Sequence, residues 1–211
     1  MTINSPLIKK LLLICGILIP IIYIGTDIFA GLLYERYNFL DQAISELSAI
    51  GSPTKIIWVS IMSLLFNPLI IAFGVGVWIF AKNNRPLNLT GILLTLWGIS
   101  GYVWFFFPMN MRGSVGSFSD TMHLVVAGTT VLLMTIFISA GAFALGKSFR
   151  LYSLLTLIIM LTFGTLVGMQ APQVAAQLAT PWMGIMERIS VYSPMLWTAT
   201  LAVVLLNKER L

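Results

Sequence analysis

Residues 40–53, LDQAISELSAIGSP, form the longest polar-bearing stretch of the chain, beginning where one long apolar run ends and stopping where the next begins. Ile44, Leu47 and Ile50 recur within it at helical spacing. Asp41 stands just before them, where its carboxylate can cap the start of a helix. The stretch therefore predicts a short amphipathic helix in the first outer loop, between two membrane-spanning helices.

The apolar runs on either side decide the class of protein. Hydrophobic residues make up 58% of the 211-residue chain and charged residues 9%, against about 25% charged in an average soluble domain. A protein of this composition has an outer surface that faces lipid. Its runs of about 20 apolar residues without strand-like alternation cross the bilayer as helices. We predict an all-α, polytopic bundle of six transmembrane helices in a single membrane domain, 1–211, with helices at about 11–31, 56–80, 88–107, 121–145, 151–170 and 183–206.

Lys and Arg residues divide unequally between the two sides of this bundle. With the N-terminus inside, the inner side carries Lys9, Lys10, Lys82, Arg85, Lys147, Arg150, Lys208 and Arg210, and the outer side carries Arg36, Lys55, Arg112 and Arg188. The positive-inside rule therefore places both termini in the cytoplasm. We expect a multi-pass protein of the cell (inner or plasma) membrane, and the net charge of +5 reflects topology rather than nucleic-acid binding.

The outer connectors carry the side chains suited to chemistry. The candidate catalytic residues are Glu46, Asp120 and His123, the last two on one face of the fourth helix, which Ser119 or Asp120 is expected to cap. The binding candidates are Ser45, Asn110, Arg112, Glu187 and Arg188. Ionisable groups near a membrane are costly unless paired or wet, so the set predicts an outward-facing polar cavity.

Three interpretations of these residues stay open. His123 could be a general base, oriented by Asp120 or Glu46, with a loop serine as nucleophile in hydrolysis or acyl transfer on a lipid. One histidine with carboxylates could hold a divalent ion, although we assign no metal ligand, since the multi-histidine pattern of ceramidase-like membrane hydrolases is missing. In the third interpretation the charges are helix caps and ion pairs, with Glu46 paired to Arg188 or Arg112.

Polar and proline residues within the spans indicate where helices bend or need partners. Asn67 is polar at membrane depth and should find an internal hydrogen-bond partner. Pro20, Pro68 and Pro194 each remove one backbone hydrogen bond from a span.

The connector motifs resemble one family. Ile44-Ser45-Glu46-Leu47-Ser48-Ala49 followed by Gly51-Ser52-Pro53 looks like the first-loop signature of the bacterial and archaeal six-span proteins of domain-of-unknown-function family 998. Phe107-Pro108-Met109-Asn110, Arg112-Gly113-Ser114 and Asp120-xx-His123 resemble its second outer loop and fourth helix, and residues 184–190 resemble the start of its sixth. One departure is Asn110, where the family leads us to expect an acid. The resemblance implies a six-helix membrane fold without an established activity. By analogy only, it extends to the DRAM and Sfk-type superfamily, which includes eukaryotic members tied to lipid remodelling.

These observations favour an integral membrane protein whose outward-facing cavity binds or modifies a lipid-like or amphipathic molecule. The alternatives are a non-catalytic structural or partner-binding membrane protein and a small transporter, which is disfavoured because only Asn67 is polar at depth. The expected partners are the lipid bilayer and a lipid or amphipathic small molecule, not nucleic acid. The sequence indicates no particular cofactor, enzymatic activity or oligomeric state.

Overall fold

The structure, a computed structural model, describes residues 5–114 and 116–209. Over those residues six helices are long and apolar enough to cross a membrane, as the sequence predicts. The first begins at Pro6 rather than near residue 11. The earlier start has a local cause, because Ser5 caps the helix by accepting a hydrogen bond from Ile8 N at 3.3 Å, and proline suits a first turn. Arg210, used above for orientation, lies outside the described residues.

Three of the spans are composite. The elements are, in chain order, α1 (Pro6–Leu33), the 3₁₀ helix η1 (Ile44–Ser48), α2 (Lys55–Ile61), the π-helical turn η2 (Met62–Phe66), α3 (Asn67–Ala81), α4 (Arg85–Ser100), the 3₁₀ turn η3 (Gly101–Phe105), α5 (Phe118–Ala144), α6 (Lys147–Met169), α7 (Ala171–Ala175) and α8 (Met183–Glu209). The second span joins α2, η2 and α3, the third joins α4 and η3, and the fifth joins α6 and α7.

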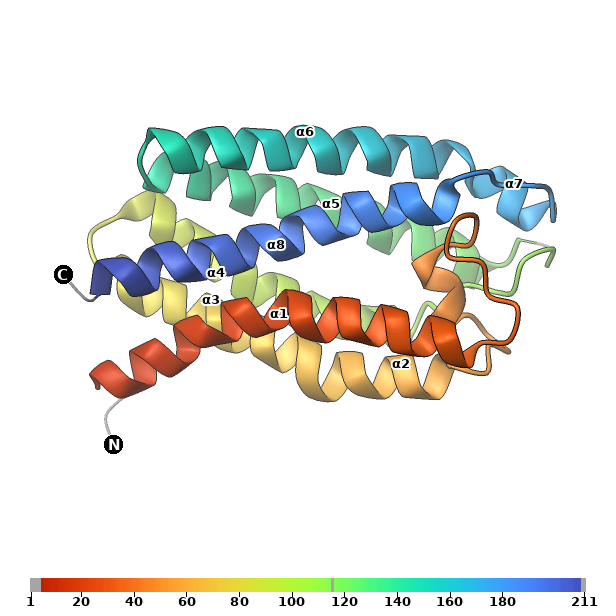
Figure 1. The fold of residues 1–211 in the computed structure, drawn as a ribbon, viewed down its shortest axis with the longest axis horizontal. Helices are drawn as coiled ribbons and strands as arrows, with labels where there is room; N and C mark the ends of the chain where they lie inside the picture. Colours follow the sequence, from red (N-terminus) through yellow and green to blue (C-terminus); the bar gives the residue numbers. More distant parts are fainter. Residues whose placement is uncertain (1–4, 115, 210–211) are drawn as a thin grey trace.

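The six spans close into a ring. α1 packs against α3, α3 against α4, α4 against α5, α5 against α6, and α6 against α8, which returns to α1 (Figure 1). One half of the ring is filled by large aromatic side chains. Trp197 is fully buried there, with its ring 5.7 Å from Phe137 and 5.6 Å from Phe149. The other half is less completely filled, as described below.

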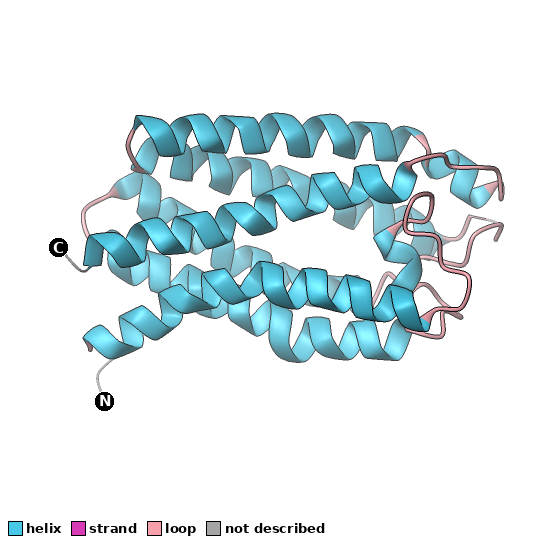
Figure 2. Cartoon of the chain, viewed as in Figure 1, coloured by secondary structure: helices cyan, strands magenta, loops and turns pink. Residues whose placement is uncertain are grey.

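The two ends of the bundle differ in their connectors (Figure 2). The long connectors, residues 34–54, 106–117 and 170–182, gather at one end, which we call the loop end. The opposite end, which we call the terminus end, carries the short turns at 82–84 and 145–146, the start of α1 and the end of α8.

The predicted amphipathic helix of the first connector is present as η1, a 3₁₀ helix of five residues. Ile44 is buried on its apolar side, whereas Ile50 is 44% exposed. The expected cap was wrong, because the Glu46 carboxylate accepts from Ala43 N at 2.9 Å at the start of η1. Asp41 accepts instead from the backbone N of Trp182 at 2.9 Å, which ties the first connector to the third.

Candidate functional site

A buried ion pair joins the first and last spans at the loop end. Arg188 of α8 donates from Nε and Nη2 to the two carboxylate oxygens of Asp27 of α1, each at 2.8 Å. The Asp27 side chain is fully buried and that of Arg188 is 11% exposed. Tyr192 also donates to Asp27. Such a bidentate, charge-assisted pair fixes both position and orientation, so α1 and α8 are locked where the connectors begin.

The same arginine holds the first connector. Arg188 Nη1 donates to the carbonyl oxygens of Phe39 at 3.0 Å and Gln42 at 3.3 Å, and Nη2 donates to the Tyr37 hydroxyl at 2.8 Å. The Tyr37 hydroxyl itself donates a hydrogen bond to the Ala43 carbonyl oxygen at 2.8 Å. Burial raises the pKa of Tyr37 above its usual value, with the nearby guanidinium acting in the opposite direction, so the hydroxyl keeps the proton that it donates.

A second ion pair joins η1 to the second connector. Arg112 donates from Nη2 to Glu46 Oε1 at 2.7 Å and from Nε to Oε2 at 3.2 Å, which is one of the two pairings that the third interpretation describes. The Glu46 side chain is 4% exposed. Arg112 Nη1 also donates to Thr180 Oγ1 at 2.9 Å. One guanidinium therefore connects all three long connectors.

Asp120 caps α5. Its carboxylate accepts from Ser117 N at 2.9 Å and from Asn110 N at 2.7 Å, and Asn110 Nδ2 donates to it at 2.8 Å. Ser117 is the N-cap, so the expectation of Ser119 or Asp120 in that place was wrong. The geometry also explains Asn110, because an amide there donates to Asp120 where an acid would repel it.

His123 is oriented by a backbone carbonyl. Its Nδ1 lies 2.9 Å from the Phe107 oxygen, and its ring forms an edge-to-face pair with Trp104, with ring centroids 4.8 Å apart. Because a carbonyl only accepts, Nδ1 carries a proton, and Nε2 is the acceptor of the neutral ring. The hydrogen bonds of Asp120 and Glu46 go to the partners given above, so neither carboxylate orients His123, contrary to that part of the base hypothesis.

A cavity of about 300 Å³ lies within the ring on the side of the loop end. Every span and η1 contribute to its lining, which is mostly aromatic and aliphatic. Besides its tryptophans, the polar or charged members of the lining are Tyr23, Ser45, Ser48, Lys55, Asn67, His123, Thr130, Glu187 and Ser190. η1 covers one end, where the carboxylate of Glu187 accepts a hydrogen bond from Ile44 N.

The predicted site residues therefore fall into two groups. Ser45, His123 and Glu187 line the cavity. Glu46, Asp120, Asn110, Arg112 and Arg188 lie outside its lining and hold the connectors and spans in place. The sequence did not indicate the pair of Asp27 with Arg188 or the roles of Tyr37 and Tyr192, since the contacts of Tyr37 with Arg188 and of Tyr192 with Asp27 join residues that are far apart along the chain.

No group of three or more His, Cys, Asp or Glu side chains that could hold a metal ion occurs among residues 5–114 and 116–209. The metal interpretation thus gains no geometric support from that part of the chain.

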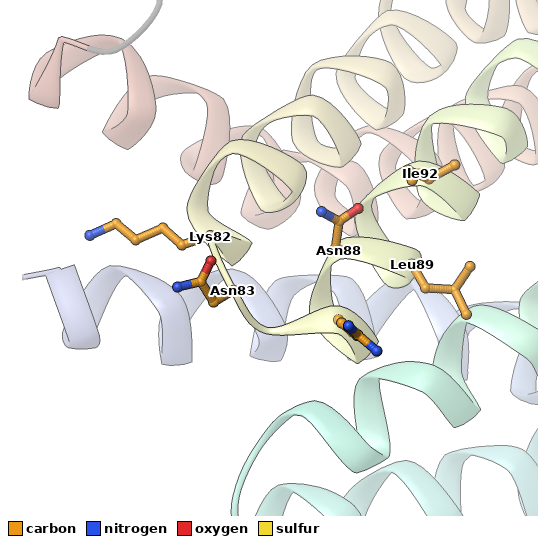
Figure 3. A pocket seen from close by; sticks show the side chains of 6 residues that line it. Lys82, Asn83, Asn88, Leu89 and Ile92 are labelled. Carbon is orange, nitrogen blue, oxygen red and sulfur yellow. The ribbon is translucent and has the colours of Figure 1, made fainter.

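A second hollow, of about 580 Å³, lies at the terminus end between α3 and α4. It is lined by Lys82, Asn83, Arg85, Asn88, Leu89 and Ile92. In Figure 3, Lys82 extends away from Leu89 and Ile92, so the polar groups do not converge on one point. The hollow forms part of a basic surface, as short connectors rich in Lys and Arg do in membrane proteins.

Residues 17–204 match one protein family, described as "Protein of unknown function (DUF998)". The matched range contains all the connector motifs on which the resemblance was based. Comparisons with curated proteins and with solved structures gave no match.

Proposed function

We propose that this chain, which belongs to the DUF998 family of proteins of unknown function, holds a lipid-like or amphipathic molecule in the cavity beneath its loop end. The chain is a membrane protein with six apolar helices, so a lipid bilayer surrounds it. The observation that carries the proposal is the cavity lining, in which aromatic and aliphatic walls meet a few polar groups. Small-molecule sites combine the same two features.

The distribution of polar groups suggests how such a molecule would lie. Lys55 comes from the first turn of the second span, His123 from the second turn of the fourth span and Ser45 from η1, so all three belong to the loop end. Trp58, Trp97 and other apolar side chains form the walls below them. A polar head group would face the first set and a hydrocarbon portion the second. At about 300 Å³ the cavity is at the small end for ligand sites, which favours a single chain or ring.

The two buried ion pairs then have a positioning role. Ile44, Ser45 and Ser48 of η1 are part of the lining, and Glu46 of the same five-residue helix is held by Arg112. Arg188 holds the connector that precedes η1. The charged residues act through η1, and they support the site without touching the ligand.

Tryptophan fluorescence tests the proposal. Trp58, Trp97 and Trp104 line the cavity, so a dodecanoic acid with a bromine at its chain end should quench them on binding. A lipid-facing background comes from Trp78 and Trp182, which are 50% and 61% exposed. We expect saturable quenching above this background in wild-type protein reconstituted in nanodiscs.

A pair of neighbouring threonines supplies the control. Thr130 lines the cavity, and Thr129 is exposed on the outer face of the same helix. Thr130→Phe should fill the cavity and abolish the saturable component, whereas Thr129→Phe should leave it unchanged. Equal quenching in both variants would refute binding inside the ring.

A second candidate function is acyl transfer or hydrolysis on the bound lipid. It is favoured by the presence of Ser45, Ser48 and His123 on one lining, with His123 Nε2 as the acceptor nitrogen. Such a serine should react covalently with a fluorophosphonate, and the label should be lost in Ser45→Ala or Ser48→Ala and in His123→Ala. No labelling of folded wild-type protein would leave the binding function alone.

We also propose that the loop end faces outward in the cell membrane, because basic residues predominate in the short connectors of the terminus end. In a Cys15→Ala background, a cysteine placed at Ser114 should react with an impermeant maleimide on intact cells, and one placed at Asn83 should not. The reverse pattern would invert the topology.

A further inference from the structure

Asn67 has a side-chain nitrogen without a hydrogen-bond partner. Its residue is 3% exposed, it lines the cavity, and its Nδ2 is unpaired. The sequence-based expectation of an internal partner is thus not met for this atom. A buried donor left unpaired costs free energy, all the more at membrane depth where no solvent competes. An unpaired buried donor of this kind indicates that the hydrogen-bond acceptor comes from a molecule outside the chain.

The backbone around Asn67 is specialised. The turn before it, η2, is π-helical, and the hydroxyl of Tyr102 donates to the Ser63 carbonyl of that turn at 3.0 Å. Pro68 follows Asn67 and has no N–H to donate. The turn places Met62, Phe66 and Asn67 together on the cavity lining. Single π-helical turns occur frequently at functional sites.

The amide of Asn67 is also held in place by close packing. A Cβ atom added to Gly101 at the start of η3 would lie 2.3 Å from Asn67 Oδ1 and 2.9 Å from Nδ2. Glycine is therefore required there for the amide to occupy its position. The side chain is a fixed group, and its unpaired nitrogen is not relieved by a simple swing toward η3.

The surroundings of Asn67 are uncharged and partly aromatic. At about 1.5 Å per residue, Asn67 lies roughly 18 Å along the span from Lys55, which is near the middle of a bilayer core about 30 Å thick. Phe66 and Trp97 form an edge-to-face pair with ring centroids 6.0 Å apart. The lining of the deeper part of the cavity also includes the flexible side chains of Met62, Met134, Met160 and Met195.

We propose that the ligand of the cavity carries an uncharged carbonyl oxygen at its deepest end, and that Asn67 Nδ2 donates a hydrogen bond to it. This inference rests on the proposed function and specifies the class of its ligand. A charged group on the ligand is disfavoured at this position because no charged side chain lines the deeper part of the cavity. A carbonyl is favoured over a hydroxyl because it only accepts, and so matches the unpaired donor without introducing a further donor that needs a partner.

Competition between matched probes tests the inference. A medium-chain methyl ketone and the alkane of the same length would each displace the bromine-tipped dodecanoic acid from wild-type protein. We expect the ketone to bind about tenfold more tightly than the alkane, the size of one hydrogen bond made in an apolar site. In Asn67→Leu the preference for the ketone should be lost, with the affinity for the alkane retained. The infrared carbonyl band of a carbon-13-labelled ketone should lie at lower frequency in wild-type protein than in the variant.

The melting temperature of Asn67→Leu without ligand shows whether a loss of binding comes from unfolding of the variant. If Nδ2 has no partner in the empty protein, Asn67→Leu should melt at the same temperature as wild-type protein or above it. A lower melting temperature, or equal binding of ketone and alkane by the wild-type protein, would overturn the inference. Failure of the brominated acid itself to bind would instead refute the proposed function, so the two failures are distinguishable.

Discussion

The loop end and the terminus end close the same six-helix ring in different ways. At the terminus end the turns are short, and α4 is capped by the side chain of Asn84, which accepts from Leu87 N at 3.1 Å. Lys82 and Arg85 there are exposed to their surroundings. At the loop end Asp27 and Glu46 are buried, each in a bidentate pair with an arginine of another segment.

This difference indicates what the loop end is built to do. Short turns are enough to connect helices, as the terminus end demonstrates, and burying charges costs more than it returns unless the pairing is complete. The buried pairs fix η1 over the cavity, where η1 supplies a part of the lining that lies outside the spans. The costly buried ion pairs therefore lie where they hold η1 over the cavity.

The largest effect should come from breaking the pair between the first and last spans. Arg188→Met leaves the Asp27 carboxylate buried and unpaired, so we expect a loss of about 3–5 kcal/mol of stability. Thermal unfolding in detergent, followed by circular dichroism, measures it. The matched control is Arg36→Met, since Arg36 and Glu35 form a pair at 91% and 90% exposure and should contribute nothing measurable. Similar melting of the two variants would remove the distinction between buried and exposed pairs.

A smaller loss is expected at η1. Glu46→Gln removes one charge from the pair with Arg112, but the amide can still accept a hydrogen bond, and the Arg112 side chain is 20% exposed. We expect about 1–3 kcal/mol. A double-mutant cycle with Arg112→Met should give a coupling of at least about 1 kcal/mol. Additive single effects would show that the pair does not stabilise the loop end.

Next in size is the substitution that restores the acid suggested by the family resemblance. Asn110→Asp replaces a donor to Asp120 by a second carboxylate, so we expect a loss of about 1–2 kcal/mol at neutral pH. The loss should shrink as the pH falls, because uptake of one proton by the pair removes the repulsion and restores a donor. Asn110→Ala, which removes the donor without adding charge, should lose stability without that pH dependence. An Asp variant as stable as wild-type protein at neutral pH would contradict the assigned contact.

The smallest effect is expected at the terminus end. Lys82 has a backbone φ of +46°, a conformation that costs a side-chain-bearing residue about 1 kcal/mol. Lys82→Gly should therefore raise stability by about that amount. The control is Lys9→Gly, which lies within α1 and should lower it by about 0.5–1 kcal/mol. Destabilisation by both glycines would mean that Lys82 contributes contacts beyond its backbone.

The sequence predicts the spans well because their lengths and hydropathy follow from the thickness of the bilayer. Helix ends were less accurate, since the start at Pro6 depends on the local cap of Ser5. At α5, the spacing of Asp120 and His123 suggested an interaction between them. The carboxylate is instead taken by Asn110 and by Ser117 of the capping turn, and local hydrogen bonding decides the outcome.

The long-range pairs could not be predicted in the same way. Asp27 and Arg188 are 161 residues apart, and no sequence spacing relates groups on the first and last spans until the ring is known to close between them. The unpaired nitrogen of Asn67 is likewise invisible in sequence, because it depends on which atoms the neighbouring helices present. The sequence indicated only that Asn67 is a polar residue at membrane depth.

Mass spectrometry of the intact protein, released gently from membranes, tests the central claim most directly. If the cavity holds a lipid-like molecule, wild-type protein and Thr129→Phe should carry a non-covalent adduct of defined mass, and Thr130→Phe should not. An adduct that persists in folded Thr130→Phe, or wild-type protein that is free of any adduct and takes up none from added membrane lipids, would contradict the claim.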